Sequence, residues 1–440
     1  MKSIPEFKRK TGLSKTNRVL KIAIMVLLLC SGSLLFADGE NLTLKIAVVG
    51  PGDELYLWWG HIGLIVEDSN TGRSYFYDYG VFNFEDDNFF VNFAFGRLLY
   101  KCAVSNALRN IDFYERTNRN VVVYTLDLPP ETRLKASSFA ANNVIENPYY
   151  FYHHFEDNCS TRIRDIIDLA VDGQLKEQTQ NKTSRFTLRE HISRHSWFSP
   201  PADWFLNFLM GQVIDTPISV WEEMFLPAEL GSALENFWYT DINGERRKLV
   251  SSAETVLTAK DRPPILDKPL IRWPHCLLFS LVLAAIFLFF FILQTKNIRA
   301  GRILSGISMS LCALVSGSFA LLLYFMSIFT NHDYTYQNIN MLFYTPLLLA
   351  AVPFGIGYAF TKKPKKLQTY SELLRLIWLL SAAGVIISIL IKLLPWFYQD
   401  NLADQMIVLP IALVFTCNPA GLKETLNKYF PRKTQNPQKV

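Results

Sequence analysis

Charged residues are scarce in this chain, and cysteines are scarcer. Lys, Arg, Asp and Glu make up 19% of the 440 residues, whereas 50% are hydrophobic and 14% aromatic, and only six are cysteine. The net charge of +5 is small, and the Lys and Arg residues cluster beside apolar runs instead of forming a stripe interleaved with aromatics. This distribution gives no reason to expect a nucleic-acid partner. The low charge and high apolar content are typical of membrane proteins.

The chain also lacks the spacings that hold a zinc ion. It contains no closely spaced cysteine pair, and no glutamate follows His191 in the helical pair His191 and His195. The other candidate ligands are His153 and His154 with the two carboxylates after them. Neither group completes a zinc motif, so we predict no metal and no cofactor. His154 is instead a candidate for lining a site next to Cys159.

The N-terminus has the parts of a signal peptide. Basic residues between positions 8 and 21 precede an apolar run at 22–30, and small residues lead to Ala37. We therefore expect residues 1–37 to be a signal peptide that directs the export of the chain from residue 38 onward. Lipidation at Cys30, for which Leu29 is an unusual neighbour, and an uncleaved anchor are the alternatives, and both lead to export as well.

Residues 38–262 are predicted to form a soluble α+β domain. Apolar alternation predicts strands at 42–48, 58–66, 73–79 and 120–128. A Pro-Pro-Glu opening predicts a helix over 130–147, and the polar segment 174–184 is expected to be a loop. A proline-rich linker over 263–271 ends the domain.

Residues 272–420 are predicted to form an all-α transmembrane bundle of about five helices, with a basic tail at 421–440 after it. The apolar runs are 276–293, 303–328, 341–360, 373–394 and the shorter 406–417. Basic residues concentrate at 296–302, at 362–366 and in the tail, whereas 331–340 and 398–405 contain no Lys or Arg. Because basic segments stay in the cytoplasm, the N-terminal domain is expected outside.

Cys159 begins a predicted helix and is the candidate nucleophile. One apolar stripe at helical spacing is formed by Ile163, Ile166, Ile167 and Ala170. Asp157 or Asn158 would cap this helix, which leaves the Cys159 sulfur among unsatisfied backbone N–H groups. Arg162 and Arg164 lie within about one turn of it, and positive surroundings of this kind favour a reactive thiolate.

His61 is the candidate base. The strand at 58–66, a turn at 68–72 and the strand at 73–79 form a predicted β-hairpin with His61 at its mouth. Side chains on neighbouring strands lie close together, so Asp78 or Tyr79 is expected to orient the imidazole. We favour Asp78.

These motifs resemble two groups of proteins. A histidine on a hairpin, with an Asn-Cys pair that opens a helix later in the chain, resembles the circularly permuted, papain-like thiol fold of the NlpC superfamily. The motifs Trp-Gly-His-Ile-Gly-Leu at 59–64, Tyr-Gly-Val-Phe-Asn-Phe at 79–84 and Asp-Asn-Cys-Ser-Thr-Arg at 157–162 resemble more closely the Lnb family of bacterial lipoprotein N-acyltransferases. This resemblance covers almost the whole chain after residue 37, and Asp78 departs from the asparagine-like residue expected there. It implies a bacterial cytoplasmic membrane protein with its thiol domain on the periplasmic side.

The resemblance also implies a reaction. Cys159 would take a fatty acyl chain from a phospholipid as a thioester and pass it to the N-terminal amine of a diacylglyceryl-cysteine lipoprotein. His61 would move the protons, and backbone N–H groups at the helix start would form an oxyanion hole. Further substrate contacts are expected near Cys159 and in 331–340, which resembles the Lnb membrane region. These candidates are Trp59, His154, Asn158, Arg162, Arg164, His332, Asn338 and Asn340.

Two other functions fit the same residues. A periplasmic cysteine hydrolase of the NlpC type, acting on cell-wall peptides or lipids, would use water as the acceptor. A non-enzymatic membrane binding or assembly protein would keep Cys159 as a buried thiol or pair it with Cys102, the only other cysteine in 38–262. All three functions place the protein at the lipid bilayer.

Overall fold

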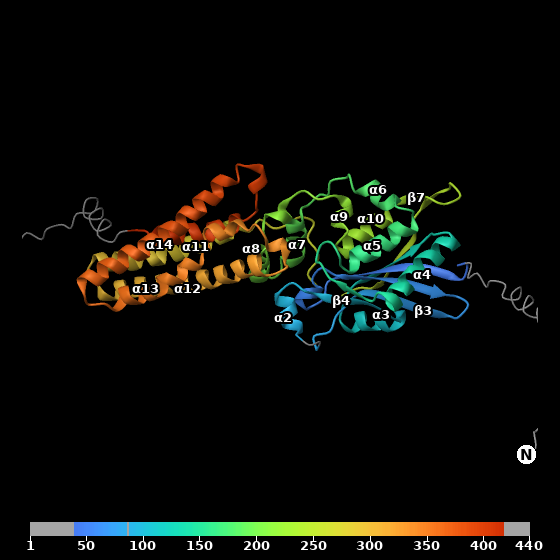
Figure 1. Ribbon diagram of the computed structural model, residues 1–440, viewed down its shortest axis with the longest axis horizontal. Helices are drawn as coiled ribbons and strands as arrows, with labels where there is room; N and C mark the ends of the chain where they lie inside the picture. The colour runs from blue at the N-terminus through green and yellow to red at the C-terminus, as the bar shows by residue number, and fades with distance from the viewer. Residues whose placement is uncertain (1–38, 86–87, 418–440) are drawn as a thin grey trace, which may run out of the picture.

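The computed structural model describes residues 39–85 and 88–417, and the expected signal peptide and the basic tail at 421–440 lie outside the described residues. Figure 1 shows two parts that lie one after the other along the long axis, an N-terminal domain built on a β-sheet and a C-terminal bundle of helices. Helices α7 (Leu188–Ser196) and α8 (Pro200–Leu209) lie where the two parts meet. This junction is close to the candidate nucleophile.

An antiparallel sheet of seven strands forms the centre of the N-terminal domain. In spatial order the strands are β6 (Tyr149–Phe151), β4 (Leu99–Asn106), β3 (Arg73–Val81), β2 (His61–Asp68), β1 (Leu42–Val49), β5 (Val121–Leu126) and β9 (Val250–Leu257). The four predicted strands are confirmed, but the one expected at 58–66 begins only at His61. Gly60, with a φ of +83°, turns the chain just before it.

Helices cover both faces of the sheet. On one face α4 (Pro130–Glu146), α5 (Cys159–Ala170) and α10 (Pro227–Glu235) lie over a core that contains Ile62, Leu64 and Ile163. On the other face α3 (Ala107–Arg116) covers Ile65 and Phe76. Alternate residues of β2 point into different cores. A shift of the strand pairing by one residue would move each side chain to the opposite face of the sheet, so the burial of these residues fixes the register.

The segment 174–184 was expected to be a loop, and this is wrong for its first half. Helix α6 (Gln174–Thr179) forms there because Leu175 and Thr179 are buried and the Asp168 carboxylate accepts a hydrogen bond from the Lys176 N–H at 2.9 Å. The remaining short elements of this domain are η1 (Leu55–Leu57), α2 (Phe89–Ala94), η2 (Gln212–Asp215), α9 (Val220–Glu223), β7 (Trp238–Thr240) and β8 (Arg246–Lys248).

The bundle contains the predicted apolar segments. Its helices are α11 (Trp273–Thr295), α12 (Arg299–Phe329), α13 (Ala351–Phe360), α14 (Pro364–Ile391) and α15 (Leu402–Phe415). Four segments, namely α11, α12, Ile339–Phe360 and α14, are long and apolar enough to cross a membrane, and α15 is shorter. The third is not one α-helix, because η4 (Ile339–Leu342) and η5 (Pro346–Ala350) precede α13, and Pro346 begins a new turn where a backbone donor is missing.

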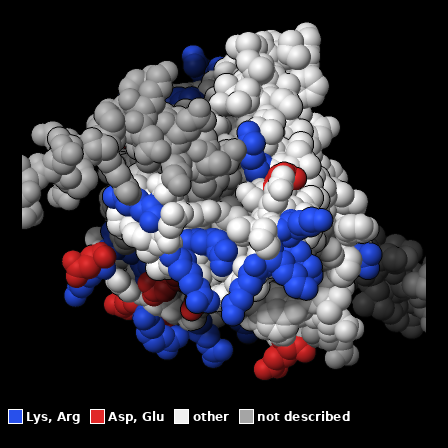
Figure 2. Space-filling model, turned by 90° about the vertical axis from the view of Figure 1, so that its left-hand side faces the viewer, with Lys and Arg blue, Asp and Glu red and all other residues white. Residues whose placement is uncertain are grey.

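Lys and Arg side chains gather on the end of the bundle that is farther from the N-terminal domain (Figure 2). The turns on this end, between α11 and α12 and between α13 and α14, contribute Lys296, Arg299, Arg302, Lys362, Lys363, Lys365 and Lys366. The segment between α12 and α13 lies at the opposite end, where the Asn331 N–H donates to the Phe95 carbonyl at 2.9 Å. This asymmetry fits a bundle whose basic end is cytoplasmic.

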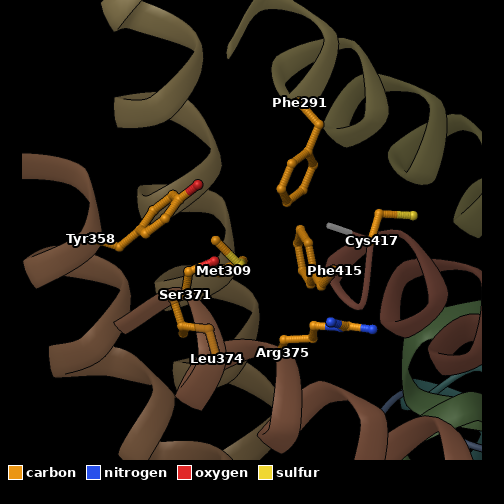
Figure 3. Close-up of a pocket in the computed structure, with 8 residues that line it drawn as sticks. All are labelled: Phe291, Met309, Tyr358, Ser371, Leu374, Arg375, Phe415 and Cys417. Atoms are coloured by element: carbon orange, nitrogen blue, oxygen red, sulfur yellow. The ribbon is translucent and has the colours of Figure 1, made fainter. Parts of the chain in front are cut away.

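A small hollow lies between the helices near the basic end of the bundle (Figure 3). The rings of Phe291, Tyr358 and Phe415 line it, together with Arg375 from α14. These residues come from the ends of α11, α13, α14 and α15 that are remote from the N-terminal domain. The hollow is therefore separate from Cys159, and we assign it no part in the chemistry.

Arg189 of α7 holds the junction together. Its guanidinium donates to both carboxylate oxygens of Asp215 at 2.7 and 2.9 Å, and to the carbonyls of Met210 and Gly211 at 3.0 and 2.9 Å. Both charged side chains are only 4% exposed. The Gly211 N–H in turn donates to the carbonyl of Tyr334 at 2.8 Å, so this ion pair supports the contact between the two parts.

We expect Arg189→Met to lower the free energy of unfolding by about 3–5 kcal/mol, because the variant leaves the Asp215 carboxylate buried without its partner. Thermal unfolding of the detergent-solubilised protein, monitored by tryptophan fluorescence, measures the change. The matched control is Arg185→Met, since the Arg185 side chain is 67% exposed and lies 3.9 Å from Glu229. That variant should cost less than about 1 kcal/mol. Equal losses in the two variants would contradict the role of Arg189.

Candidate active site

Asn158 determines where α5 begins and therefore where Cys159 lies. Its Oδ1 accepts hydrogen bonds from the N–H groups of Ser160 and Thr161 at 2.8 and 3.0 Å, and the Thr161 hydroxyl accepts from the Asn158 N–H at 2.8 Å. Its Nδ2 donates to the carbonyl of His154 at 2.8 Å. The cap does not take the N–H of Cys159 itself, which stays beside the sulfur at the positive end of the helix.

His61, Asp78 and Cys159 come together beside the start of α5. The Nε2 atom of His61 lies 3.1 Å from Oδ1 of Asp78, and the imidazole lies close enough to Cys159 for the charge of that residue to raise the pKa of the ring. The structure thus brings together the three residues that the sequence proposed as catalytic.

The register of the hairpin explains this geometry. Gly63 pairs with Asp78 across β2 and β3, so His61 lies opposite Gly80. Asp78 is then the diagonal neighbour of His61 on the same face of the sheet. A Cβ atom at Gly80 would lie 2.7 Å from Cε1 of His61, so the ring needs a glycine there. The Gly80 N–H also donates to Oδ1 of Asp78 at 2.7 Å, which fixes the carboxylate.

Burial lowers the pKa of His61, but the charges of Asp78 and Cys159 and hydrogen bonds to both outweigh burial and raise that pKa from 6.5 to about 10. Burial raises the pKa of Asp78, yet the His61 charge, the His61 hydrogen bond and the Gly80 N–H bring it below its ordinary value. The resting site therefore holds an imidazolium between the Asp78 carboxylate and the Cys159 sulfur.

Two tyrosines outside the predicted site lie close enough to Cys159 for its charge to act on them. The rings of Tyr100, from β4, and Tyr152, from the segment before α5, stack with centroids 4.2 Å apart. Burial, and after it the charge of Cys159, raises the pKa of both phenols above the ordinary value, so both stay neutral. The one signal in the sequence was the aromatic run at 149–152 directly before the cysteine loop.

The two arginines that come after Cys159 have partners within the protein. Arg162 forms two hydrogen bonds to the Asp157 carboxylate, at 2.5 and 2.6 Å, and its guanidinium lies 4.3 Å from the centroid of the Tyr150 ring. Arg164 lies 3.9 Å from the Trp221 ring and donates to the Trp221 carbonyl at 3.0 Å. Since these contacts occupy both guanidinium groups, their role in substrate binding stays a prediction.

The segment between α12 and α13 reaches the cysteine loop. Oδ1 of Asp333 lies 2.8 Å from Nε2 of His153, and the Tyr334 ring packs 5.3 Å from the ring of His154. His332 bonds to the Tyr334 hydroxyl through Nδ1 at 2.8 Å. Burial, then the charges of His153 and His332, lower the pKa of His154 to about 4, so this ring is neutral at pH 7. The predicted candidates His154 and His332 therefore lie at one junction.

Asn338 and Asn340 are buried at this junction and hold the end of α8. Both amides donate to the carbonyl of Phe208, at 2.9 and 3.1 Å, and Asn340 also donates to Asp404 at 3.2 Å. These bonds give the two asparagines a structural role, and direct contact with a substrate stays a prediction. Trp59 packs nearby, and its buried indole N–H has no hydrogen-bond partner among the described residues.

The described part of the chain contains no group of three or more His, Cys, Asp or Glu residues that would hold a metal ion. Cys102 and Cys159 are both buried free thiols in this structure. Burial raises the pKa of Cys102 to about 11, which makes it a poor nucleophile at neutral pH. Of the two thiols, Cys159 is the one that influences the pKa of the His61 imidazole.

We expect Asp78→Asn to lower the pKa of His61, because the Asp78 charge is the strongest influence that raises this pKa against burial. NMR titration of the protein with ring-labelled histidine measures the change, and a His61→Gln sample assigns the resonance. In the wild type the resonance should titrate near pH 10, and in Asp78→Asn at a clearly lower pH. Titration at the same pH in both proteins would contradict the coupling.

Comparison with known protein families identifies two matches. Residues 35–194, which include all three proposed catalytic residues, match the Lnb N-terminal periplasmic domain, and residues 272–417 match the Lnb transmembrane domain. No curated protein and no solved structure matches the chain. The N-terminal domain is thus periplasmic, the bundle makes this a multi-pass membrane protein, and the family indicates an enzyme of lipoprotein processing. The two matches, in this order and over more than half of the chain, show that the protein belongs to the Lnb family.

Proposed function

We propose that the protein is a thiol acyltransferase that moves a fatty acyl chain from a phospholipid to the N-terminal amine of a diacylglyceryl-cysteine lipoprotein. The observation that carries the proposal is the Cys159 sulfur at a helix N-terminus, near an imidazole that Asp78 orients. Membership of the Lnb family supports lipoprotein processing, and acyl transfer through a thioester is the step that we add. The arrangement also favours the permuted, NlpC-like order, which stays a prediction.

The first half-reaction loads the enzyme. The sulfur attacks as a thiolate whose proton has already passed to His61: the bond from sulfur to the ester carbonyl carbon of the phospholipid forms, and the ester carbon–oxygen bond breaks. His61 gives its proton to the departing lysophospholipid oxygen, and its raised pKa keeps that proton available at neutral pH. The N–H of Cys159, which the Asn158 cap leaves unused, is the donor that we assign to the oxyanion.

The second half-reaction transfers the chain. The neutral amine of the acceptor attacks the thioester carbonyl, the carbon–nitrogen bond forms, and the carbon–sulfur bond breaks. His61, neutral after the first step, takes the proton that the amine loses, so the imidazolium beside the sulfur is restored. Asp78 stabilises the imidazolium in both resting and product states and does not exchange the proton itself.

Transfer to an amine requires that water reach the thioester slowly. The Cys159 residue is 8% exposed, and the stacked rings of Tyr100 and Tyr152 lie beside it. Contacts of His153 and His154 with the segment between α12 and α13 keep this site at the end of the bundle, where both lipid substrates are anchored. These features favour a transferase over a hydrolase. We assign Trp59 and His154 as substrate contacts at this junction.

Mass spectrometry tests the proposal on the purified full-length protein mixed with phospholipid and a diacylated lipopeptide. We expect an N-acylated lipopeptide and an acyl adduct on Cys159 from the wild type. Cys159→Ala and His61→Gln should each lower product formation by about a hundredfold or more, because nucleophile and proton carrier act as one unit. Cys102→Ala is the matched control and should keep its activity.

The two alternative functions predict different products. Free fatty acid or a cleaved peptide as the main product would show that the protein is a hydrolase and would contradict the proposed transfer. No turnover, together with a Cys102–Cys159 bond in the peptide map, would instead support a structural protein and sink the proposal.

The rate of loading is also expected to fall as the pH rises through the His61 pKa near 10, because a neutral imidazole has no proton for the leaving oxygen. Below that pH His61 is an imidazolium that can protonate the leaving oxygen, so the rate of loading stays high. Asp78→Asn lowers the pKa of His61, so its rate should begin to fall at a lower pH than that of the wild type. The initial release of lysophospholipid over a pH series measures both curves. A descending limb at the same pH in the two proteins would exclude His61 as the proton donor.

A further inference from the structure

Helix α2 exposes large apolar side chains at one place on the N-terminal domain. Phe90 is 72% exposed, Val91 55% and Phe93 48%. Phe84, which contacts the ring of Phe89 at 5.0 Å, is itself 50% exposed. Single exposed apolar residues are common on soluble proteins, but a contiguous aromatic patch indicates a surface that another apolar phase covers.

Helix α2 is attached to the outer end of a membrane-spanning helix. The ring of Phe95, directly after α2, packs 5.6 Å from the ring of Phe325 in α12. The Asn331 N–H donates to the Phe95 carbonyl at 2.9 Å, and Nε2 of His332 lies 3.0 Å from the Phe93 carbonyl. Figure 1 shows α2 on the side of the N-terminal domain that faces the bundle. These contacts place α2 beside the end of α12 that is nearer to the N-terminal domain.

The surface of the bundle next to α2 is also apolar and exposed. Ile328 and Phe329, in the last turn of α12, are 58% and 67% exposed. Such residues face lipid in a membrane protein, and the Phe329 ring stacks on the ring of Phe325, which in turn contacts Phe95 directly after α2. Arg97 is exposed, and its guanidinium lies 5.7 Å from the centroid of the Phe95 ring. A cation and aromatic rings at one level are typical of the membrane–water interface.

A row of aromatic rings leads from α2 to the nucleophile. Phe90 contacts Phe89 with centroids 5.5 Å apart, and Phe89 stacks on Phe82 at 5.9 Å. Phe82 contacts Tyr100 at 4.9 Å, Tyr100 stacks on Tyr152 at 4.2 Å, and the charge of Cys159 acts on both phenols. The residues of this row between Phe90 and Cys159 are half-buried.

We infer that α2 inserts its aromatic face into the outer leaflet of the membrane, and that this row of rings guides one acyl chain of the donor phospholipid from the leaflet to Cys159. The second half of the inference rests on the proposed function, whereas the membrane contact does not. A lipid surface is the occupant because the patch adjoins the exposed apolar end of α12 and has the cation of Arg97 beside it. Burial of exposed aromatic rings in the acyl region drives the insertion.

Photochemical crosslinking tests the membrane contact without depending on activity. The full-length protein carries p-benzoylphenylalanine in place of Phe90 and is reconstituted into vesicles of phosphatidylethanolamine and phosphatidylglycerol. The matched control has the same replacement at Phe113 on α3, which is 49% exposed but belongs to a helix on a face of the sheet. After irradiation, mass spectrometry should find about tenfold more lipid adduct at position 90 than at position 113.

Two results would overturn the membrane contact. Equal lipid adduct at both positions would mean that α2 is no closer to the leaflet than α3. A crosslink from position 90 into a second protein chain, in place of lipid, would make the patch a protein interface.

The route to Cys159 is tested with Phe90→Glu and Phe113→Glu. Phe90→Glu should lower the release of lysophospholipid from vesicles by about tenfold, while its rate with soluble dibutanoyl phosphatidylcholine should change by less than about twofold, because only the vesicle donor must leave a leaflet. Phe113→Glu should leave both rates unchanged. Equal losses with the two donors would refute the route. If the wild type itself releases no lysophospholipid from either donor, the proposed function fails, and the crosslinking result still decides the membrane contact.

Discussion

The side-chain amide of Asn158 is the contact on which the active site depends. Its oxygen caps the N-terminus of α5 and so determines the position of the Cys159 sulfur. Its nitrogen donates a hydrogen bond to the carbonyl of His154. The rings of His153 and His154 then meet the segment between α12 and α13. One buried amide therefore links the direction of the nucleophile to the position of the membrane bundle. A hydrophobic residue at this place would leave several buried backbone groups without partners.

Burial and charge act against each other in this site. Burial alone would discharge both His61 and Asp78, and the site keeps them charged because each lies next to the opposite charge. Such an arrangement costs stability, since the charges have left water. The gain is a proton that stays on the imidazole at neutral pH and a sulfur that is close to it. The same burial limits the access of water to the sulfur, as the proposed transfer to an amine requires.

Local periodicity predicted much of this structure. The strands that carry His61 and Asp78, the turn between them and the helix of Cys159 all arise from patterns within about twenty residues, where the physical cause is local. The diagonal contact from His61 to Asp78 is a consequence of the hairpin register. Contacts between distant segments were not readable in this way. Tyr100 and Tyr152 look like core residues, α6 is too polar for its helical pattern to stand out, and the partners of Arg162 and Arg164 depend on tertiary packing.

The combination of a sheet domain with a membrane bundle has a chemical reason. Both lipid substrates of the proposed reaction remain in the bilayer, so a thiol in a freely diffusing domain would rarely meet them. Contacts at Asp333, Tyr334 and Phe325 instead hold the thiol domain in one place at the end of the bundle. Because of this attachment, the proposed reaction needs no separate encounter of the thiol domain with the two lipid substrates. The thiol domain is already oriented at the end of the bundle. The Arg189–Asp215 ion pair, which supports the contact of Gly211 with Tyr334, thus contributes to the proposed catalytic arrangement.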